Sequence, residues 1–441
     1  MTDNPARSLQ SGPKVNPFVL ALGCLYFAAV PFLPLRTILV GPTHVVNWLG
    51  LVFAGAALVF WQFRRVASDR AWLTASGILL VSCGIGFLRA PEFARQSVIL
   101  WLQRFFLPWL VVSLSPLDKR FLRSLCASWL AGLCFTGAWQ LYTTARADFV
   151  ATEYSQYSYS RLLQSGEEWD LAMRMGIYNT HGCMAMSVAA ACAFVHTLSC
   201  KRMTHKLVFG FCAIFLIFSE WHGRFIASDL LAALGVILVF PVAYYRSKSG
   251  LTTALIGLGI TILLAIGVVY FADLSVDSTA ARINTLLDDG LRADASISAR
   301  YDLLSVSVGS WLSSPLIGVG LVGWTPDSYD LVGMHNSIVD VPAQLGIIGF
   351  LGYYGLIFFP LKRAIAVLRM RGCAILDRET ARVVFIGMAL FFVSTIINPP
   401  FMMALISETL LLLAALGTTL TSRMVQVGGR SDPSQASRVS G

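Results

Sequence analysis

The sequence predicts an all-α fold, a polytopic integral membrane protein with about twelve transmembrane helices and a partly helical loop outside the membrane. Of the 441 residues, 56% are hydrophobic and only 13% are charged, whereas an ordinary soluble domain has about 25% charged residues. Apolar runs of about 20 residues, the length that crosses a bilayer as a helix, recur along almost the whole chain. Residues 1–441 are therefore expected to form a single membrane domain.

The expected spans fall into three groups along the chain. No small-residue cleavage site follows the first apolar run, so we expect a retained helix and no cleaved signal peptide. The approximate spans are 17–35, 45–63, 72–88, 97–115, 122–143, 180–199, 207–221, 225–245, 252–272, 338–361, 383–397 and 401–421.

The basic residues are distributed unevenly between the connecting segments. With the N-terminus inside, 22 of the 33 Lys and Arg residues, including every lysine, belong to one face. Because cytoplasmic loops carry an excess of Lys and Arg, this face and both termini are predicted to be cytoplasmic. The net charge of +9 then reflects membrane topology, so we expect the lipid bilayer as a partner and no nucleic acid.

This topology leaves two long segments on the opposite, periplasmic face, at residues 145–179 and 273–334. Loops of this length in a compact bundle are usually functional or disordered, and the aromatic and apolar residues in both favour order. The polar tail at residues 424–441 is expected to be disordered in the cytoplasm.

The second periplasmic segment contains a helical pattern, "SISARYDLLSVSVGSWL". Ser298 is the expected N-cap, and Leu304, Val308, Trp311 and Leu312 then fall on one face. The following "SSPLIGVG" ends this helix in a turn. Its glycines are not expected to bind a nucleotide, because no strand precedes them.

The eleven basic residues outside the cytoplasmic set are all arginines. Guanidinium binds phosphate oxygens in a bidentate fork, so this excess favours an anionic ligand. Arg174 precedes a span, and Arg224 lies in a short hairpin between spans. Arg300 is expected in the first turn of the loop helix, where an anion bound by both Arg300 and the helix N-terminus would stabilise this placement. Arg104 is expected near the middle of a span. Pairing with lipid headgroups or carboxylates is the alternative for all four.

The segment "MHNSIVDVPAQLGIIGF" begins with a histidine and an asparagine before an apolar run. His335 alone is more typical of a helix cap, but imidazole titrates near neutral pH and suits proton transfer from a sugar hydroxyl. Asn336 would orient the ring or bind substrate. The nine cysteines and six histidines show no metal-ligand spacing, so neither a metal nor another cofactor is expected.

The stretches "SARYDLLSVSVGSWLSSPLIGVGLVGW" and "MHNSIVDVPAQLGIIGF" resemble the signature region of the O-antigen ligase and O-antigen polymerase family. In that family an arginine-bearing loop helix ends in a Pro-Leu-(Ile/Leu)-Gly-Val-Gly turn, and a His-Asn pair precedes an apolar segment. "HGRFIASDLLAALGV" and "RMGIYNTHGCMAM" are similar to its upstream arginine segments. The match covers roughly residues 220–355. The chain departs from the family at Gly223, where serine is usual, and at Gln344, where an acidic residue is common.

The resemblance implies a metal-independent glycosyltransferase of the bacterial inner membrane with a periplasmic active site. Its donor would be a glycan linked to polyprenyl diphosphate, and its acceptor a glycolipid or glycan hydroxyl, the lipid A core in a ligase. Arg300 and Arg224, with Arg174 in support, would bind the diphosphate. His335 would be the general base, and Asn336 and Arg104 would have supporting roles.

Two other classes of function stay open from the sequence. An O-antigen or exopolysaccharide polymerase shares these motifs and differs in its acceptor, a second carrier-linked glycan, and a protein-directed oligosaccharyltransferase is a third variant. A glycolipid flippase or secondary transporter also suits twelve spans. Transporters usually carry charged or helix-breaking residues at the midplane of matching halves, and no internal repeat is evident here.

Overall fold

The described part of the chain is almost entirely α-helical, which confirms the predicted fold class. One small exception is an antiparallel ribbon of two-residue strands, β1 (Leu39–Val40) and β2 (Thr43–His44). The computed structural model describes residues 16–32, 35, 39–40, 43–60, 65–146, 180–222, 226–244, 295–322, 336–370, 373–397 and 404–420.

Eleven of the described α-helices coincide with predicted spans, and α14 belongs to the predicted periplasmic loop. Short 3-10 turns, η2 (Val66–Ser68) and η3 (Glu92–Ala94), precede α4 and α5. The helices are α1 (Pro17–Ala29), α3 (Val45–Val59), α4 (Arg70–Leu88), α5 (Arg95–Leu114), α6 (Lys119–Arg146), α9 (Thr180–Ser199), α10 (Met203–His222), α11 (Ile226–Ala243), α14 (Ala295–Ser313), α15 (Ser337–Arg369), α16 (Ile375–Ile397) and α17 (Ala404–Thr418).

Six helices of the described residues are long and apolar enough to cross a membrane, which supports a polytopic membrane protein. They are α4, α6, α9, α10, α15 and α16. Five further apolar helices coincide with predicted spans but are shorter over the described residues. The expected span at 252–272 lies outside the described residues, so the number of about twelve stays a prediction.

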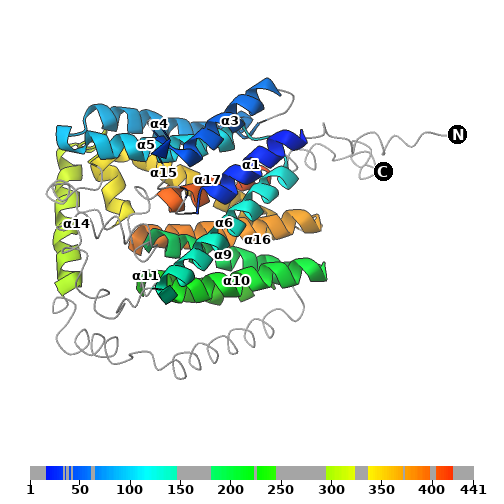
Figure 1. Ribbon diagram of the computed structural model, residues 1–441. Coiled ribbons are helices and arrows are strands. Elements are labelled where there is room, and N and C mark those ends of the chain that lie inside the picture. The colour runs from blue at the N-terminus through cyan, green and yellow to red at the C-terminus, as the bar shows by residue number, and fades with distance from the viewer. Residues whose placement is uncertain are drawn as a thin grey trace, which may run out of the picture.

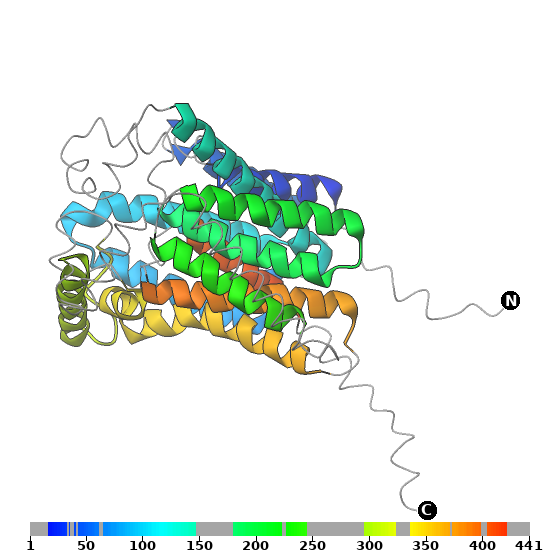
Figure 2. The same ribbon diagram turned by 90° about the horizontal axis from the view of Figure 1, so that it is seen from below.

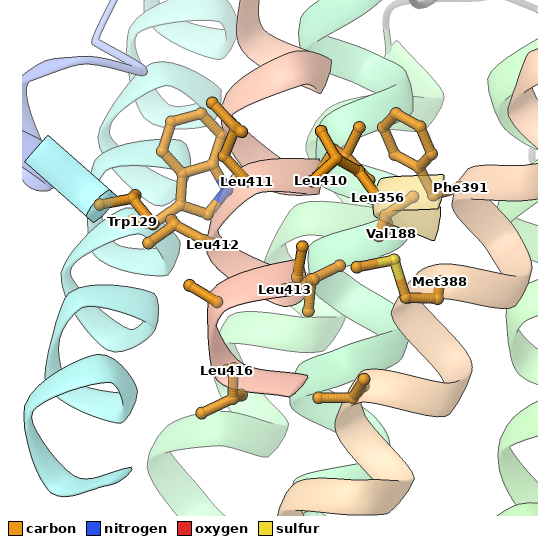
Figure 3. Packing of buried hydrophobic residues seen from close by; sticks show 14 of the residues in the cluster. Trp129, Val188, Leu356, Met388, Phe391, Leu410, Leu411, Leu412, Leu413 and Leu416 are labelled. Atoms are coloured by element: carbon orange, nitrogen blue, oxygen red, sulfur yellow. The ribbon is translucent and has the colours of Figure 1, made fainter. Parts of the chain in front are cut away.

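The core of the bundle lies where α6, α9, α15, α16 and α17 meet. Figure 3 shows Trp129 of α6, Val188 of α9, Leu356 of α15 and Met388 of α16 gathered around the leucines of α17. The α17 sequence "LLLLAAL" is buried on every side. A helix that is apolar all round is typical of a central position in a large or membrane-embedded bundle.

Figures 1 and 2 show most helices running side by side, while α14 lies across one end of the bundle. We call this the α14 end. Short connections, such as the turn at Cys200–Arg202 between α9 and α10, join neighbouring helices that run in opposite directions. The first turn of α15 contacts α14 through Asp340 and Ser307. The first residue of α15, Ser337, thus lies at the α14 end, and its last residue, Arg369, lies at the opposite end.

The opposite end of the bundle, which we call the basic end, is held by ion pairs. Asp69 caps α4 by accepting a hydrogen bond from Trp72 N over 3.0 Å, and its carboxylate lies 3.1 Å from Arg363 Nη2 at the end of α15. Lys119 pairs with Asp377 in the same region. Arg363 and Lys119, two of the basic residues that the sequence assigns to one face, thus lie at this end of the structure.

Candidate functional site

The start of α15, at the α14 end, is held by Asn336. This residue has extended backbone angles, and its side-chain Oδ1 accepts a hydrogen bond from Ile338 N over 2.9 Å. Its carbonyl oxygen accepts from Val339 N and Asp340 N. The first N–H groups of a helix have no partner within the helix, which is why asparagine is favoured here. The side-chain oxygen of Asn336 is therefore engaged in capping the helix.

Asp340 connects this cap to the helix that crosses the end of the bundle. Its Oδ2 accepts a hydrogen bond from Asn336 N over 3.0 Å, and its Oδ1 accepts one from Ser307 Oγ of α14 over 2.8 Å. Both side chains are buried, Ser307 being 0% and Asp340 2% exposed. A buried carboxylate needs such donors to offset its lost hydration. The arrangement fixes the backbone of residue 336 against α14.

The helix α14 begins earlier than the sequence indicated. It starts at Ala295, so Ser298 lies inside the helix and the prediction of Ser298 as N-cap is wrong. Arg300 is the sixth residue of the helix and lies in its second turn. The favourable effect of a helix N-terminus on an anion is confined to the first turn, so the expectation that Arg300 shares an anion with that terminus is not supported.

Of the four apolar residues expected on one face of α14, Leu304 and Trp311 are half-buried and the other two are exposed. Val308 is 36% and Leu312 69% exposed, while Ser307 is fully buried. One contact with α15 is made by the polar Ser307, whose partner Asp340 lies 33 residues away. A helical pattern reports which residues are apolar and carries no information about this distant carboxylate.

The helix α15 is broken at Gly346, whose φ of 67° and ψ of −175° interrupt the helical backbone. The turn that follows α14 fills the break. Val319 N and Gly320 N donate to the carbonyls of α15 residues 343 and 344, while Ile347 N and Ile348 N donate to those of residues 315 and 316. An interrupted helix at membrane depth is tolerated where protein satisfies the freed backbone groups. Residues 315–322 do this here.

Glycine is required at the two points of closest approach between the turn and α15. A Cβ on Gly346 would lie 2.0 Å from the carbonyl oxygen of Leu316, and one on Gly318 would lie 2.2 Å from the carbonyl carbon of Gln344. Both glycines have positive φ angles. The Pro-Leu-Ile-Gly-Val-Gly sequence thus fits against the broken helix backbone to backbone.

Gln344 lies at the centre of this junction and is fully buried. Its Oε1 accepts a hydrogen bond from Val322 N over 3.4 Å. Its Nε2 has no acceptor among the residues that the structure describes. Because the amide is uncharged, its burial against the turn costs less free energy than the burial of a carboxylate would. This gives a physical reason for glutamine at the position.

Two further carboxylates at the α14 end are buried and were missed by the sequence analysis. Glu220 near the end of α10 and Glu408 near the start of α17 are each 1% exposed. Each is a single acidic residue at the margin of an apolar run, and a lone acidic residue in that position is weak as a sequence signal. Buried carboxylates need hydrogen-bond donors or cations around them.

The sequence-predicted site residues are described only in part. His335, Arg224 and Arg174 lie outside the described residues. The backbone of Arg300 lies in α14 and that of Arg104 near the middle of α5, as predicted for the latter. Asn336 alone is described with its side chain. The structure therefore does not bring the predicted arginines together with His335, and that assembly stays a prediction.

Within the described ranges, no three His, Cys, Asp or Glu side chains lie close enough together to hold a metal ion. The predicted loop segments and the C-terminal tail fall largely outside those ranges, apart from α14 and its turn. Compared with known proteins, the chain matches no family model and no curated protein.

Proposed function

We propose that the chain is a membrane glycosyltransferase of the O-antigen ligase type. It would move a glycan from a polyprenyl diphosphate carrier to an acceptor hydroxyl, the lipid A core, at the α14 end of the bundle. The basic end would face the cytoplasm and the α14 end the periplasm, by the excess of Lys and Arg at the basic end. Several long apolar helices support the membrane location; a bacterial inner membrane is part of the proposal.

The observation that carries the proposal is the Ser307–Asp340–Asn336 network. It fixes the backbone at residue 336, directly after His335, against α14. A general base works only when it is held within hydrogen-bond distance of the substrate proton that it removes. Arg300 lies seven residues before Ser307 in α14, and two helical turns separate positions on the same side of a helix. The network therefore supports a site between the start of α15 and α14.

In the proposed reaction, His335 takes the proton of the acceptor hydroxyl as its oxygen forms a bond to the anomeric carbon of the glycan. The bond from that carbon to the diphosphate oxygen breaks, and the carrier leaves as the polyprenyl diphosphate. Arg300, Arg224 and Arg174 would offset the negative charge that develops on this leaving group. No redox step or cofactor is involved.

A polymerase with a carrier-linked acceptor remains the nearest alternative, because the same residues would do the same chemistry. A flippase or secondary transporter is the other. The broken helix α15 is a feature that many transporters use to coordinate ions through free backbone carbonyls. Here the carbonyls of residues 343 and 344 accept hydrogen bonds from Val319 and Gly320, so this break favours a structural role.

The direct test is glycan transfer by the purified full chain, with a lipid-linked glycan donor and lipid A core as acceptor. His335→Ala is expected to lower the rate by about 10²–10⁴-fold, the usual contribution of a general base. His44→Ala, at strand β2, is the matched control and should keep the wild-type rate. Normal transfer by His335→Ala would contradict the assignment of the base.

Acceptor choice distinguishes the related activities. A ligase transfers glycan to lipid A core, whereas a polymerase lengthens a carrier-linked glycan when the core is left out. Movement of the intact donor across vesicles that contain the protein, with no transfer to either acceptor, would favour transport.

A further inference from the structure

A cavity of about 600 Å³ opens at the basic end, away from the site just proposed. Its walls come from the start of α6, the connection between α9 and α10, and the start of α16. Arg120, Arg123, Lys201 and Arg202 line it, with Glu379 as the carboxylate among its lining residues. The cavity therefore has a strong excess of positive charge and a volume within the usual range of ligand sites.

Most of this positive charge is not neutralised by the described protein. The carboxylate of Glu379 lies 3.6 Å from Arg123 Nη2. Arg120, Lys201 and Arg202 form no ion pair with any residue in the described ranges. Clustered cations repel one another, so an anion in the cavity would be stabilised by several groups at once.

A second, apolar cavity of about 100 Å³ continues from the first into the bundle. Arg123, Ala127, His196, Phe209 and Glu379 line both cavities. The inner one lies among α6, α9, α16 and α17, beside the leucines of α17 seen in Figure 3. The two together form one amphipathic space, with a basic mouth and a hydrocarbon-like interior.

Trp129 of α6 is one of the residues that line the inner cavity. Its side chain is 4% exposed, and its Nε1–H has no acceptor among the described residues. An indole N–H is a hydrogen-bond donor that usually finds a partner when buried. The indole N–H is therefore an unpartnered donor in a residue that lines the inner cavity, six residues along α6 from Arg123 of the mouth.

The helix α10 beside the mouth has one side towards the cavity and an apolar side that faces outward. His205 and Phe209 of α10 line the cavity, while Leu207, Phe211 and Ile214 on the outward face of the same helix are 63%, 70% and 69% exposed. A row of exposed apolar side chains on a candidate membrane span is expected to face lipid. The cavity therefore lies one helix away from the hydrocarbon region.

We propose that this space binds an anionic glycerophospholipid at the basic end. The phosphate would lie among Arg120, Lys201 and Arg202, an ester carbonyl would accept the Trp129 N–H, and the start of an acyl chain would fill the apolar cavity. Basic pockets between transmembrane helices bind anionic headgroups in this way. A soluble phosphate would match the mouth alone and leave both the indole N–H and the apolar cavity without a partner.

The experiment uses the full chain, purified in detergent and stripped of lipid. Binding is titrated by native mass spectrometry with dioleoyl phosphatidylglycerol, dioleoyl phosphatidylcholine and inorganic phosphate as probes. Phosphatidylglycerol is expected to bind at least about tenfold more tightly than phosphatidylcholine, since each basic group near an anionic headgroup contributes roughly fivefold. Inorganic phosphate at millimolar concentration should not displace it.

Charge-matched variants separate this site from general attraction to the basic end. The double variant Lys201→Ala/Arg202→Ala should bind phosphatidylglycerol about 25-fold more weakly, at roughly fivefold for each lost cation. Lys362→Ala/Arg369→Ala removes the same charge from exposed positions at the same end that do not line the cavity, and should bind as wild type. All four residues are exposed or unpaired, and an unchanged melting temperature without lipid verifies the fold.

Trp129→Phe tests the depth of the ligand. It removes the N–H but keeps an aromatic ring, and should weaken phosphatidylglycerol binding by about five- to tenfold, the loss of one hydrogen bond. Equal binding of the two lipids, equal losses in both double variants, or displacement by inorganic phosphate would overturn the proposal. Unchanged binding by Trp129→Phe would overturn the placement of the ester group.

Discussion

Ser307 of α14 donates a hydrogen bond to Asp340 of α15 over 2.8 Å, in a fully buried contact between two helices that cross at one end of the bundle. The other oxygen of Asp340 accepts from the backbone N–H of Asn336. One carboxylate therefore links the crossing helix to the residue that caps α15. Loosening this carboxylate should affect both the stability of the α14 end and the chemistry proposed there.

Ser307→Ala removes the donor and leaves Asp340 Oδ1 buried without it. We expect a loss of about 1.5–3 kcal/mol in the free energy of unfolding, the usual contribution of a hydrogen bond to a charged group. Ser305→Ala is the matched control, because Ser305 is exposed and its hydroxyl bonds only to Asp302 O within α14. Thermal unfolding of both variants in the same detergent gives the comparison, and equal stabilities would contradict the role of the contact.

Asp340→Asn keeps the shape of the side chain but places an amide N–H group where one of the two donors now points. In the proposed glycosyltransferase, residue 336 and the adjacent His335 would then be held less accurately. The turnover number is expected to fall about ten- to hundredfold, with little change in the KM for the lipid-linked donor. A fall confined to donor binding would show that Asp340 does not act by positioning.

Gly346→Ala should damage the junction between α15 and the turn after α14. The observed backbone angles lie in a region that only glycine adopts readily, at a cost of about 1–3 kcal/mol for other residues, and the new Cβ would collide with Leu316 O. Gly77→Ala in α4 is the control, because a Cβ there meets no heavy atom within 4 Å.

The two alanine variants should move stability in opposite directions. Alanine is favoured over glycine inside a helix by about 0.5–1 kcal/mol, so Gly77→Ala should be neutral or stabilising. Yields of folded monomer by size-exclusion chromatography, together with melting temperatures, would show the difference. A normal yield of Gly346→Ala would mean that the break can close into a regular helix.

Asp69 has two roles at the basic end that can be separated. Asp69→Asn keeps an oxygen that can cap α4 but removes the charge opposite Arg363, whereas Asp69→Ala loses both. We expect Asp69→Ala to be less stable than Asp69→Asn by about 1 kcal/mol, the usual value of an N-cap. Chemical denaturation of both variants measures the difference, and equal stabilities would show that the cap contributes nothing.

The helices and their order could be predicted from hydropathy, but their ends could not. The span expected at 338–361 continues as α15 to Arg369, and the span expected from 383 begins as α16 at Ile375. Both extensions carry charged residues that pair at the basic end, such as Arg363 and Asp377. Hydropathy falls at those charges, while the helical backbone continues through the membrane surface.

The chemistry at the α14 end was predictable only where it depended on neighbours in the sequence. A polar cap before the apolar run was predictable, although we expected it at His335 and the structure has it at Asn336. The break at Gly346 was not predicted. The contact between Ser307 and Asp340 joins segments far apart in the sequence. No local pattern marks it, and the same holds for the insertion of the Gly318 turn into α15.

The break in α15 also bears on how the protein is made. Until residues 315–322 dock, the first part of α15 would present unpaired backbone groups to lipid, each at a cost of several kcal/mol. The docking turn is synthesised before the helix that needs it, only about two dozen residues earlier. We therefore expect α14, its turn and α15 to leave the translocation machinery as one hairpin-like unit, inserting together rather than span by span.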